Sequence, residues 1–433
     1  MAELLTNLDV FTGDEQGFVP DAAILIEDSR IGWIGPAAAL PPTAATAQPR
    51  DMGGRLVVPG FVNTHAHGGM SAHRGACDDG DLFEWAAAIA PHTSVLTLED
   101  NRLGCQLAVM EMVRNGITTA CDCARFGAGI FASVASEIGM RSLSGALANS
   151  PELRKAGLPN WPLALEETQR AIAAHHGDGL ATFYVGAHSP YNCTPELLVE
   201  VKRAADRLNL PFVIHAAENR KETDIVRERH GTTPIRLLAQ LGILDRNSIL
   251  AHCVWLDAEE IDILAASGAG VAHNPVSNAK LASGIAPVPA LRRAGVPVGL
   301  GTDSTVSNNS LDIFQEMKTS VLLQRAATLD AHSAGAADAF EMATREGARV
   351  LGLGARIGSL SPGKEADLVV LDLQHPLGWT SERVLSDLVY RAGPQHVREV
   401  IVAGRTIYAE GGFTHIDAAE LTAGIHRHFA HGE

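Results

Sequence analysis

The chain has 433 residues, a formal net charge of −16 and a sequence pI of about 5.5. An acidic surface disfavours nucleic acids and anionic membranes as partners, because both carry the same sign of charge. Apolar residues make up 46% of the chain, yet they form no uncharged run of the roughly 18 residues that a membrane-spanning helix needs. We therefore expect a globular protein with a large core, either one large domain with a smaller one or two to three ordinary domains.

The cysteines indicate a reducing compartment. Their spacing does not follow a disulfide framework, and the opening MAELLTNLDVF carries acids instead of the apolar core of a signal peptide. We expect a cytoplasmic protein with free thiols. Cys121 and Cys123 form a Cys-x-Cys pair, which we interpret as two thiols at the end of a buried strand, with metal ligation as the alternative.

Both ends of the chain predict short strands. Residues 1–58 include AAILIEDSRIGWIG, two apolar strands around a turn at Asp28 and Ser29. After residue 355, RIGSLSPGKEADLVVLDL predicts strand, turn and strand, and VREVIVAGRTIYAEGG predicts a hairpin. We expect residues 1–58 and 356–433 to form one small β-sandwich domain, with a C-terminal helix from Ala418 to His431.

Residues 59–355 alternate between strand-like and helix-like segments, which is the pattern of a (β/α)₈ TIM barrel. The helical stretches include ELLVEVKRAADRLN and DAEEIDILAASG. The strand candidates are LVVPGFVNTH, GITTACDC, RSLSGALAN, ATFYVGAH, PFVIHAAE, SILAHC, GAGVAHNP and PVGLGTD.

Polar residues with metal-ligand chemistry stand where these apolar runs stop. His65 and His67 are two residues apart on one strand and therefore point to the same face. Because barrel enzymes place their active sites at the carboxyl ends of the strands, we expect one cluster there. The other members are His215, Glu218, His252 and Asp303.

This set predicts a metal-dependent hydrolase. A divalent metal ion held by His65, His67, His215 and Asp303 leaves a position for water and makes hydroxide available near neutral pH. Glu218 is then free to protonate a ring nitrogen while hydroxide attacks the adjacent carbon. His252 hydrogen-bonds the attacking oxygen, and Asp303 also passes a proton to the leaving group, for which ammonia is the best candidate.

Two further residues are candidates for the substrate pocket. His188 also ends a strand, and we favour contact with the substrate over a structural cap. Trp85, in LFEWAAAIAP, either lines a pocket for an aromatic substrate or belongs to the core.

The long motifs of the chain resemble those of the amidohydrolase superfamily, in particular the branch of S-adenosylhomocysteine/methylthioadenosine deaminases and s-triazine hydrolases. The resemblance implies a single divalent ion, zinc with iron as the alternative, on the same ligands, and a homo-oligomer. Binuclear relatives place a carboxylated lysine where this chain has His188, which supports one metal and a substrate contact. The motifs are PGFVNTHAHGGMSAHRG, GAHSPYNCTPE, VIHAAEN, AHCVWL, the segment from AHNPVSNAKL to DIFQEMK, and GSLSPGKEADLVVLDL.

Two departures from the branch concern the substrate. Adenosine-type relatives carry a glutamate for the ribose hydroxyls after the tryptophan-containing helix, where this chain has APHTSVLT with His92, Thr93 and Ser94. They also carry an arginine shortly after the third strand begins, where this chain has SLSGALANS. A nucleoside, a free base, a pterin and a triazine therefore all stay open as substrates.

Three functions follow in order of preference. The first is a metal-dependent aminohydrolase that deaminates an amino-substituted nitrogen heterocycle. The second is the same scaffold hydrolysing another bond, such as an aryl halide or a cyclic amide. The third is a non-catalytic relative. The presence of Glu218 favours deamination, because a ring nitrogen needs a proton donor there.

Overall fold

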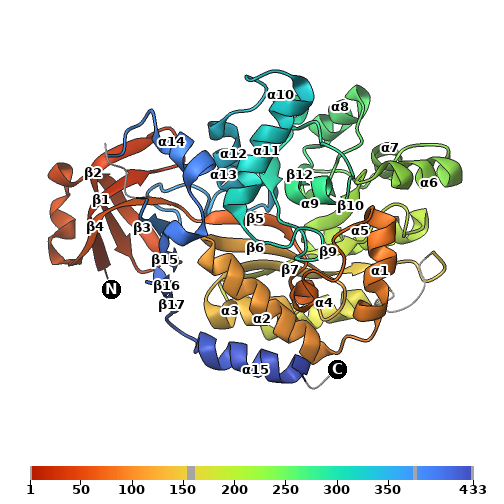
Figure 1. Ribbon diagram of the computed structural model, residues 1–433, viewed down its shortest axis with the longest axis horizontal. Helices are drawn as coiled ribbons and strands as arrows, with labels where there is room; N and C mark the ends of the chain where they lie inside the picture. The colour runs from red at the N-terminus through yellow and green to blue at the C-terminus, as the bar shows by residue number, and fades with distance from the viewer. Residues whose placement is uncertain (1, 154–160, 374–377, 431–433) are drawn as a thin grey trace.

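The strands of the computed structural model form two sheets, and the two ends of the chain share one of them. The structure describes residues 2–153, 161–373 and 378–430. In Figure 1 the red N-terminal strands and the blue C-terminal strands lie on the same side of the molecule, next to the barrel. The predicted (β/α)₈ barrel is confirmed, and both chain ends build the smaller β domain as predicted; the β-sandwich expected there is, among the described residues, a single eight-stranded sheet.

The first sheet has eight strands, and its order joins the two ends of the chain where β14 pairs with β4. The predicted turn at Asp28 and Ser29 separates β2 from β3, and the predicted hairpin consists of β15 and β16. In spatial order the strands are β17 (Gly412–Phe413), β16 (Arg405–Ala409), β15 (Val397–Val402), β14 (Leu368–Leu371), β4 (Gln48–Pro59), β1 (Ala2–Phe11), β2 (Phe18–Glu27) and β3 (Arg30–Pro36).

One predicted strand is wrong. Residues 356–361 form turns, because Gly358 has a φ of +91° that extended backbone does not allow. The segment instead attaches to the end of the first sheet through a 2.8 Å hydrogen bond from the Leu360 N–H to the Thr12 carbonyl.

The second sheet is the barrel, and all of its paired strands run parallel. Every one of the eight predicted barrel segments contains one of these strands. They are β5 (Phe61–Ala66), β6 (Ile117–Ala124), β7 (Arg141–Ala148), β8 (Ala181–Phe183) continued by β9 (Val185–Ala187), β10 (Phe212–Ala216), β11 (Ser248–His252), β12 (Gly270–His273) and β13 (Val298–Leu300).

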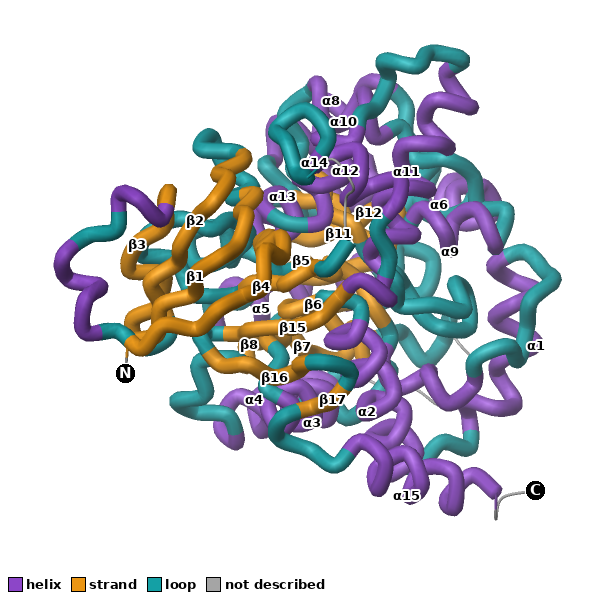
Figure 2. The backbone as a smooth tube through the Cα atoms, turned by 60° about the vertical axis from the view of Figure 1, so that its left-hand side comes forward, coloured by secondary structure: helices purple, strands orange, loops and turns teal. Residues whose placement is uncertain are grey.

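Helices cover the outside of the barrel, as the tube in Figure 2 shows around its orange strands. Their ends carry the expected signals: Thr194 caps α5 ahead of a proline, and Asp257 forms a capping box on α8. The helices along the barrel are α1 (Leu82–Ser94), α2 (Leu98–Arg114), α3 (Ile130–Ile138), α4 (Leu163–Ala174), α5 (Pro195–Leu208), α6 (Arg220–His230), α7 (Pro234–Gln240), α8 (Ala258–Ser267), α9 (Pro275–Lys280), α10 (Val288–Arg293), α11 (Ile313–Thr328), α12 (Ala336–Ala343) and α13 (Arg345–Val350).

Two α-helices follow the barrel in the described part of the chain, the short α14 (Val384–Ser386) and α15 (Ala418–Ala430). The predicted C-terminal helix is therefore present, and its last predicted residue, His431, lies outside the described residues. In Figure 1 α15 runs along α2, and His428 Nε2 lies 2.6 Å from Asp100 Oδ1 there. Within the described part of the chain, no helix combines the length and apolarity needed to cross a membrane.

Alternation along the strands separates the inside of the barrel from the outside. On β6, Cys121 and Cys123 belong to the same buried cluster as Val62 and Tyr184 of neighbouring strands, whereas Ala120 belongs to the larger cluster beneath the helices. The barrel is thus filled by side chains, and its functional groups can gather only at its open carboxyl end.

A buried ion-pair network ties the barrel to the first sheet. Arg141, at the start of β7, is fully buried and donates to both carboxylate oxygens of Asp367 at 3.1 Å, and it also pairs with Glu365. Asp367 in turn accepts a 2.7 Å hydrogen bond from the Ala403 N–H, beside β15. These contacts fix the first sheet against the amino-terminal end of the barrel.

We expect Arg141→Met to lower the free energy of unfolding by about 3–5 kcal/mol, because it leaves the buried Asp367 without its counter-charge and leaves Glu365 with Arg356 alone. Arg227→Ala, which removes an exposed ion pair with Asp224, serves as the control and should change little. Urea titration of both variants measures the difference. Equal stability of the two variants would mean that the buried network contributes nothing.

Candidate active site

The site forms where the last barrel strand meets the first. The Asp303 N–H donates to the His65 carbonyl at 2.9 Å, and Ala66 and Asp303 form a parallel bridge. Gly301 makes this approach possible, because a Cβ at that position would come within 2.8 Å of the His65 Cβ. Closure of the barrel therefore places the Asp303 carboxylate beside the His-x-His pair.

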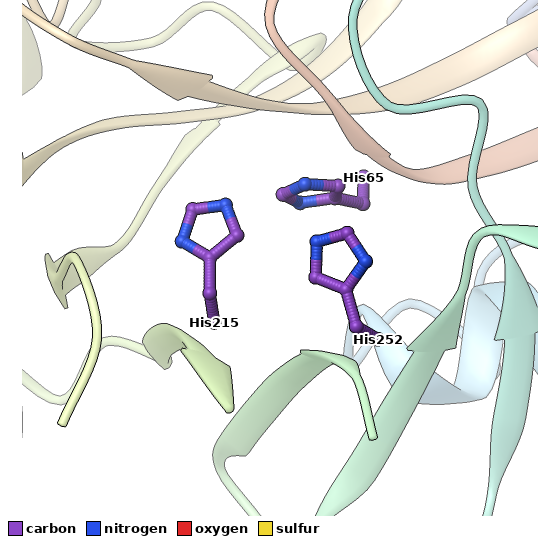
Figure 3. A group of neighbouring side chains, drawn as sticks. All are labelled: His65, His215 and His252. Carbon is purple, nitrogen blue, oxygen red and sulfur yellow. The ribbon is translucent and has the colours of Figure 1, made fainter. Parts of the chain in front are cut away.

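Imidazoles from three strands surround this carboxylate. His65 Nε2 and His67 Nε2 lie 3.6 and 3.5 Å from Asp303 Oδ1, and His215 Nε2 lies 3.3 Å from His67 Nε2. Figure 3 shows the rings of His65, His215 and His252 turned toward one another from β5, β10 and β11. The structure thus brings together every residue predicted as a metal ligand or as a catalytic group.

Hydrogen bonds on the far side of the rings set their tautomers. His67 Nδ1 lies 2.6 Å from the Cys123 carbonyl, and His215 Nδ1 lies 2.7 Å from the His188 carbonyl. A carbonyl only accepts, so both Nδ1 atoms carry the proton and both Nε2 atoms present a lone pair. Fixing ligand histidines through the other ring nitrogen is the usual arrangement in metal sites.

The donor set fits a divalent cation. His65 Nε2 is buried and has no hydrogen-bond partner among the described residues. Ligand atoms of His65, His67 and Asp303 lie within 4.8 Å of one another, and so do those of His65, His215 and His252. Imidazole and carboxylate ligands suit zinc, and an unpartnered buried nitrogen is costly unless something binds it.

Burial keeps the rings neutral. It lowers the pKa of His67 to about 4, with His65 adding to the effect, and it lowers the pKa of His65, His215 and His252 as well. Burial opposes ionisation of Asp303, but the neighbouring His65 and His67 rings hold its pKa well below its usual range. The cluster therefore presents neutral imidazoles and one carboxylate at neutral pH.

The carboxyl of Glu218 lies in the same site as Asp303 but favours the opposite protonation state. Burial, reinforced by the charge of Asp303, raises the pKa of Glu218 well above its usual range, which favours the protonated carboxyl. Its Oε2 lies 3.6 Å from His252 Nε2. The buried Glu222 carboxyl holds this loop by accepting hydrogen bonds from the N–H groups of Glu218, at 2.8 Å, and Ala217, at 3.3 Å.

His252 faces the same space from the end of β11. Its Nδ1 lies 2.9 Å from Asn278 Oδ1 and 3.3 Å from Asn274 Nδ2, and the nearer partner is an acceptor, which places the ring proton on Nδ1 and the Nε2 lone pair toward Glu218. The residue has a φ of +76°, a strained conformation outside glycine that is found at functional sites.

A cavity of about 340 Å³ opens above this cluster. Both predicted substrate residues line it. Trp85 comes from α1, and its buried indole N–H has no hydrogen-bond partner among the described residues. His188 follows β9, and its Nδ1 lies 3.1 Å from the Asn192 amide nitrogen, which places the ring proton on Nε2.

The sequence analysis missed several residues of the cavity wall. Arg125 stands two residues after Cys123, directly beyond β6, so the strand-end criterion that selected the histidines also applied to it. Tyr191 and Asn192 follow His188 within the motif GAHSPYN. Arg229 and Phe83 reach the cavity from α6 and α1, and no local pattern marks them.

His92 and Thr93 do not line this cavity, although they stand where adenosine-type relatives carry a sugar-binding acid. Thr93 is buried, and its hydroxyl donates to the Ile89 carbonyl of its own helix at 3.1 Å. His92 is exposed on the last turn of α1 and packs beside His73, with ring centroids 5.9 Å apart. Neither side chain replaces the missing acid in this structure.

Comparison with known proteins identifies the family. The model of the Amidohydrolase family matches residues 56–407. A 5-methylthioadenosine/S-adenosylhomocysteine deaminase of Syntrophobacter fumaroxidans is 40% identical over 408 residues, which cover 93% of this chain and 92% of that protein. The chain therefore belongs to the amidohydrolase family, and the predicted assignment is confirmed.

Solved structures agree with the fold. The zinc-bound adenosine deaminase of Xanthomonas campestris superposes with a TM-score of 0.92 at 31% identity, covering 99% of this chain and 98% of the other. The zinc-bound atrazine chlorohydrolase of Arthrobacter aurescens reaches a TM-score of 0.89 at 21% identity, covering 98% and 99%, and this likeness concerns the fold alone. The predicted reaction class, hydrolysis of a C–N bond outside peptides, agrees with the two deaminases.

We expect His215→Ala and Asp303→Ala each to lower the metal content of the purified protein, because each removes a donor from the cluster. Elemental analysis by mass spectrometry measures the content per chain. As a control, His332→Ala removes an exposed histidine that does not belong to the cluster, and it should leave the metal content unchanged. Full metal content in both site variants would mean that the ligand set is wrong.

Proposed function

We propose that the chain is a zinc-dependent aminohydrolase that removes the amino group from the adenine ring of an adenosine-type nucleoside and releases ammonia. Iron(II) is the alternative ion. The proposed ligands are His65, His67, His215 and Asp303, and the proposed catalytic groups are Glu218, His252 and again Asp303.

The position of Glu218 carries the proposal. Its carboxyl faces the imidazole cluster, with Oε2 3.6 Å from His252 Nε2, yet it belongs to neither group of residues whose atoms converge as metal ligands in the described chain. A protonated acid beside a cluster of metal ligands is what attack on an aromatic ring carbon requires, since the neighbouring ring nitrogen must gain a proton as water adds.

The chain's own groups divide the reaction between them. When bound, the divalent ion supplies a nucleophile by lowering the pKa of water toward neutrality. Glu218 gives its proton to the ring nitrogen next to the carbon that bears the amino group. His252 accepts a hydrogen bond from the attacking water through Nε2 and holds it in line. Asp303 takes the proton that leaves this water and returns it to the amino group as its C–N bond breaks, and the remaining hydroxyl proton returns to Glu218 as the ring C=O forms.

The choice of a nucleoside rests on the relatives and on the cavity. The 40% identical relative is named for 5-methylthioadenosine and S-adenosylhomocysteine, and the 31% identical structure for adenosine. The cavity of about 340 Å³ is walled by Phe83, Trp85 and Tyr191, which suits a planar ring.

A free base, pterin or triazine is the second candidate, and one observation favours it. Among the described residues that line the cavity, the carboxylates are Glu218 and Asp303, and both belong to the catalytic cluster. No further acid of that wall is placed to accept hydrogen bonds from ribose hydroxyls.

The proposal extends to the compartment, the oligomeric state and the partners of the enzyme. We infer a cytoplasmic homo-oligomer with a small heterocyclic substrate as its ligand, without nucleic acid or membrane partners. Free thiols at all six cysteines, five of them buried, suit a reducing compartment. Light scattering on the purified protein measures the oligomeric state.

We expect Glu218→Gln to keep its metal and to lose turnover by about 10³-fold, because an amide cannot shuttle the proton. Ammonia release at saturating substrate measures the loss, and elemental analysis confirms that the metal is retained. Glu200→Gln, on the exposed face of α5, is the matched control and should retain wild-type turnover. Near-normal turnover of Glu218→Gln would remove Glu218 from the mechanism.

A substrate panel separates the two candidates. We expect the metal-loaded protein to release ammonia from methylthioadenosine, S-adenosylhomocysteine or adenosine with a kcat/KM well above that for guanine, cytosine, isoxanthopterin and melamine. The opposite order would place the substrate among free bases, pterins or triazines. Release of chloride from a chlorotriazine, without any ammonia release, would contradict deamination itself.

A further inference from the structure

The four imidazoles of the cluster depend on partners at Nδ1, and these partners differ in kind. The partners of His67 and His215 are backbone carbonyls, at 2.6 and 2.7 Å. His252 uses the side-chain amide of Asn278, at 2.9 Å. For His65 the neighbour of Nδ1 is a thiol, the Sγ of Cys123, at 3.4 Å.

The direction of this last hydrogen bond decides what His65 can do. If the thiol donated, the ring proton would sit on Nε2, which would then point an N–H at the cluster and could not bind a cation. If Nδ1–H donates to sulfur, Nε2 presents a lone pair. The unpartnered, buried state of His65 Nε2 and its 3.6 Å distance to Asp303 Oδ1 fit the second arrangement in a site that takes a metal.

We propose that Cys123 is a positioning residue, whose sulfur accepts the Nδ1–H hydrogen bond of His65 and so holds that ring in its ligand tautomer and orientation. This inference rests on the metal site proposed above.

The place of Cys123 on β6 explains how one residue serves two histidines. β6 runs parallel to β5, with Ala66 opposite Asp122. The Cys123 carbonyl lies within the sheet and reaches His67 directly after β5, while its side chain points into the barrel, where it meets His65. Both members of the His-x-His pair are therefore oriented by the same residue, once through backbone and once through sulfur.

The hydrogen bond between His67 and the Cys123 carbonyl involves the backbone and is retained when the side chain at position 123 is replaced. The contact between His65 and the Cys123 sulfur is lost. The chain also offers a close control. Cys121 lies two residues earlier on the same strand, is fully buried and belongs to the same cluster inside the barrel. Its sulfur neighbours that of Cys123, but the contact to His65 Nδ1 belongs to Cys123. Loss of the Cys121 thiol therefore removes an equal volume from the same core and leaves the sulfur beside His65 in place.

Zinc affinity tests the proposal, measured by competition with a chelator on the metal-free full-length protein. We expect Cys123→Ala to bind zinc about 10–100-fold more weakly than wild type, the usual effect of losing a partner behind a ligand. Cys123→Ser should recover most of this loss, because a hydroxyl oxygen also accepts from Nδ1–H. Cys121→Ala should bind zinc as wild type does.

Equal zinc affinity of Cys123→Ala and wild type would overturn the proposal, and so would an equal loss in Cys121→Ala, which would point to core packing. If the wild-type protein itself bound no zinc, the proposed metal site would fail along with this inference. If the wild-type protein bound zinc and Cys123→Ala bound it equally well, only the role of Cys123 would be ruled out.

Cobalt(II) supplies a second readout that does not require the alanine variant to fold. The wild-type protein loaded with cobalt should show ligand-field bands without a thiolate-to-cobalt charge-transfer band in the near ultraviolet. Such a band, lost in Cys123→Ser, would make the sulfur a direct ligand and contradict its role behind His65. Altered ligand-field bands in Cys123→Ser, with no charge-transfer band in either protein, would support that role.

Discussion

The hydrogen bond between the Asp303 N–H and the His65 carbonyl closes the barrel at the point where its chemistry is concentrated. It joins the last strand to the first and holds the Asp303 carboxylate 3.6 and 3.5 Å from the His65 and His67 Nε2 atoms. Gly301 allows the approach, since any side chain there would meet the His65 Cβ. Each remaining group of the cluster then follows from the parallel order of the strands between these two.

Burial acts in opposite directions on the acids and the bases of this cluster. It favours the neutral form of each group, which leaves the imidazoles their lone pairs and favours the protonated carboxyl of Glu218. Asp303 departs from this pattern because the rings beside it stabilise its charge. Two carboxyl groups in one small site thus favour different protonation states, and this difference supports Glu218 as the acid that protonates the ring in the proposed mechanism.

The wall above the cluster draws on elements other than the strand ends. Trp85 and His188 line the cavity, whereas His92 and Thr93 lie outside it. The polar side chains of that wall include Arg125, Asn149, Tyr191, Asn192 and Arg229. The wall is thus built from helices α1 and α6 and from loops after the strands, whereas the imidazole cluster is built from the strand ends.

The sequence alone determined the barrel, the residues of the imidazole cluster and the family. The reason is that strand ends in a parallel barrel converge, and the residues at those ends form motifs that can be recognised in the sequence. It did not determine residues 356–361, where Gly358 turns the chain, nor the cavity wall, where Arg229 and Phe83 arrive on helices distant in sequence. The hydrogen-bond partners of the rings also needed the tertiary structure. A tautomer depends on which atom lies behind Nδ1, and that atom belongs to a neighbouring strand whose register no single segment specifies.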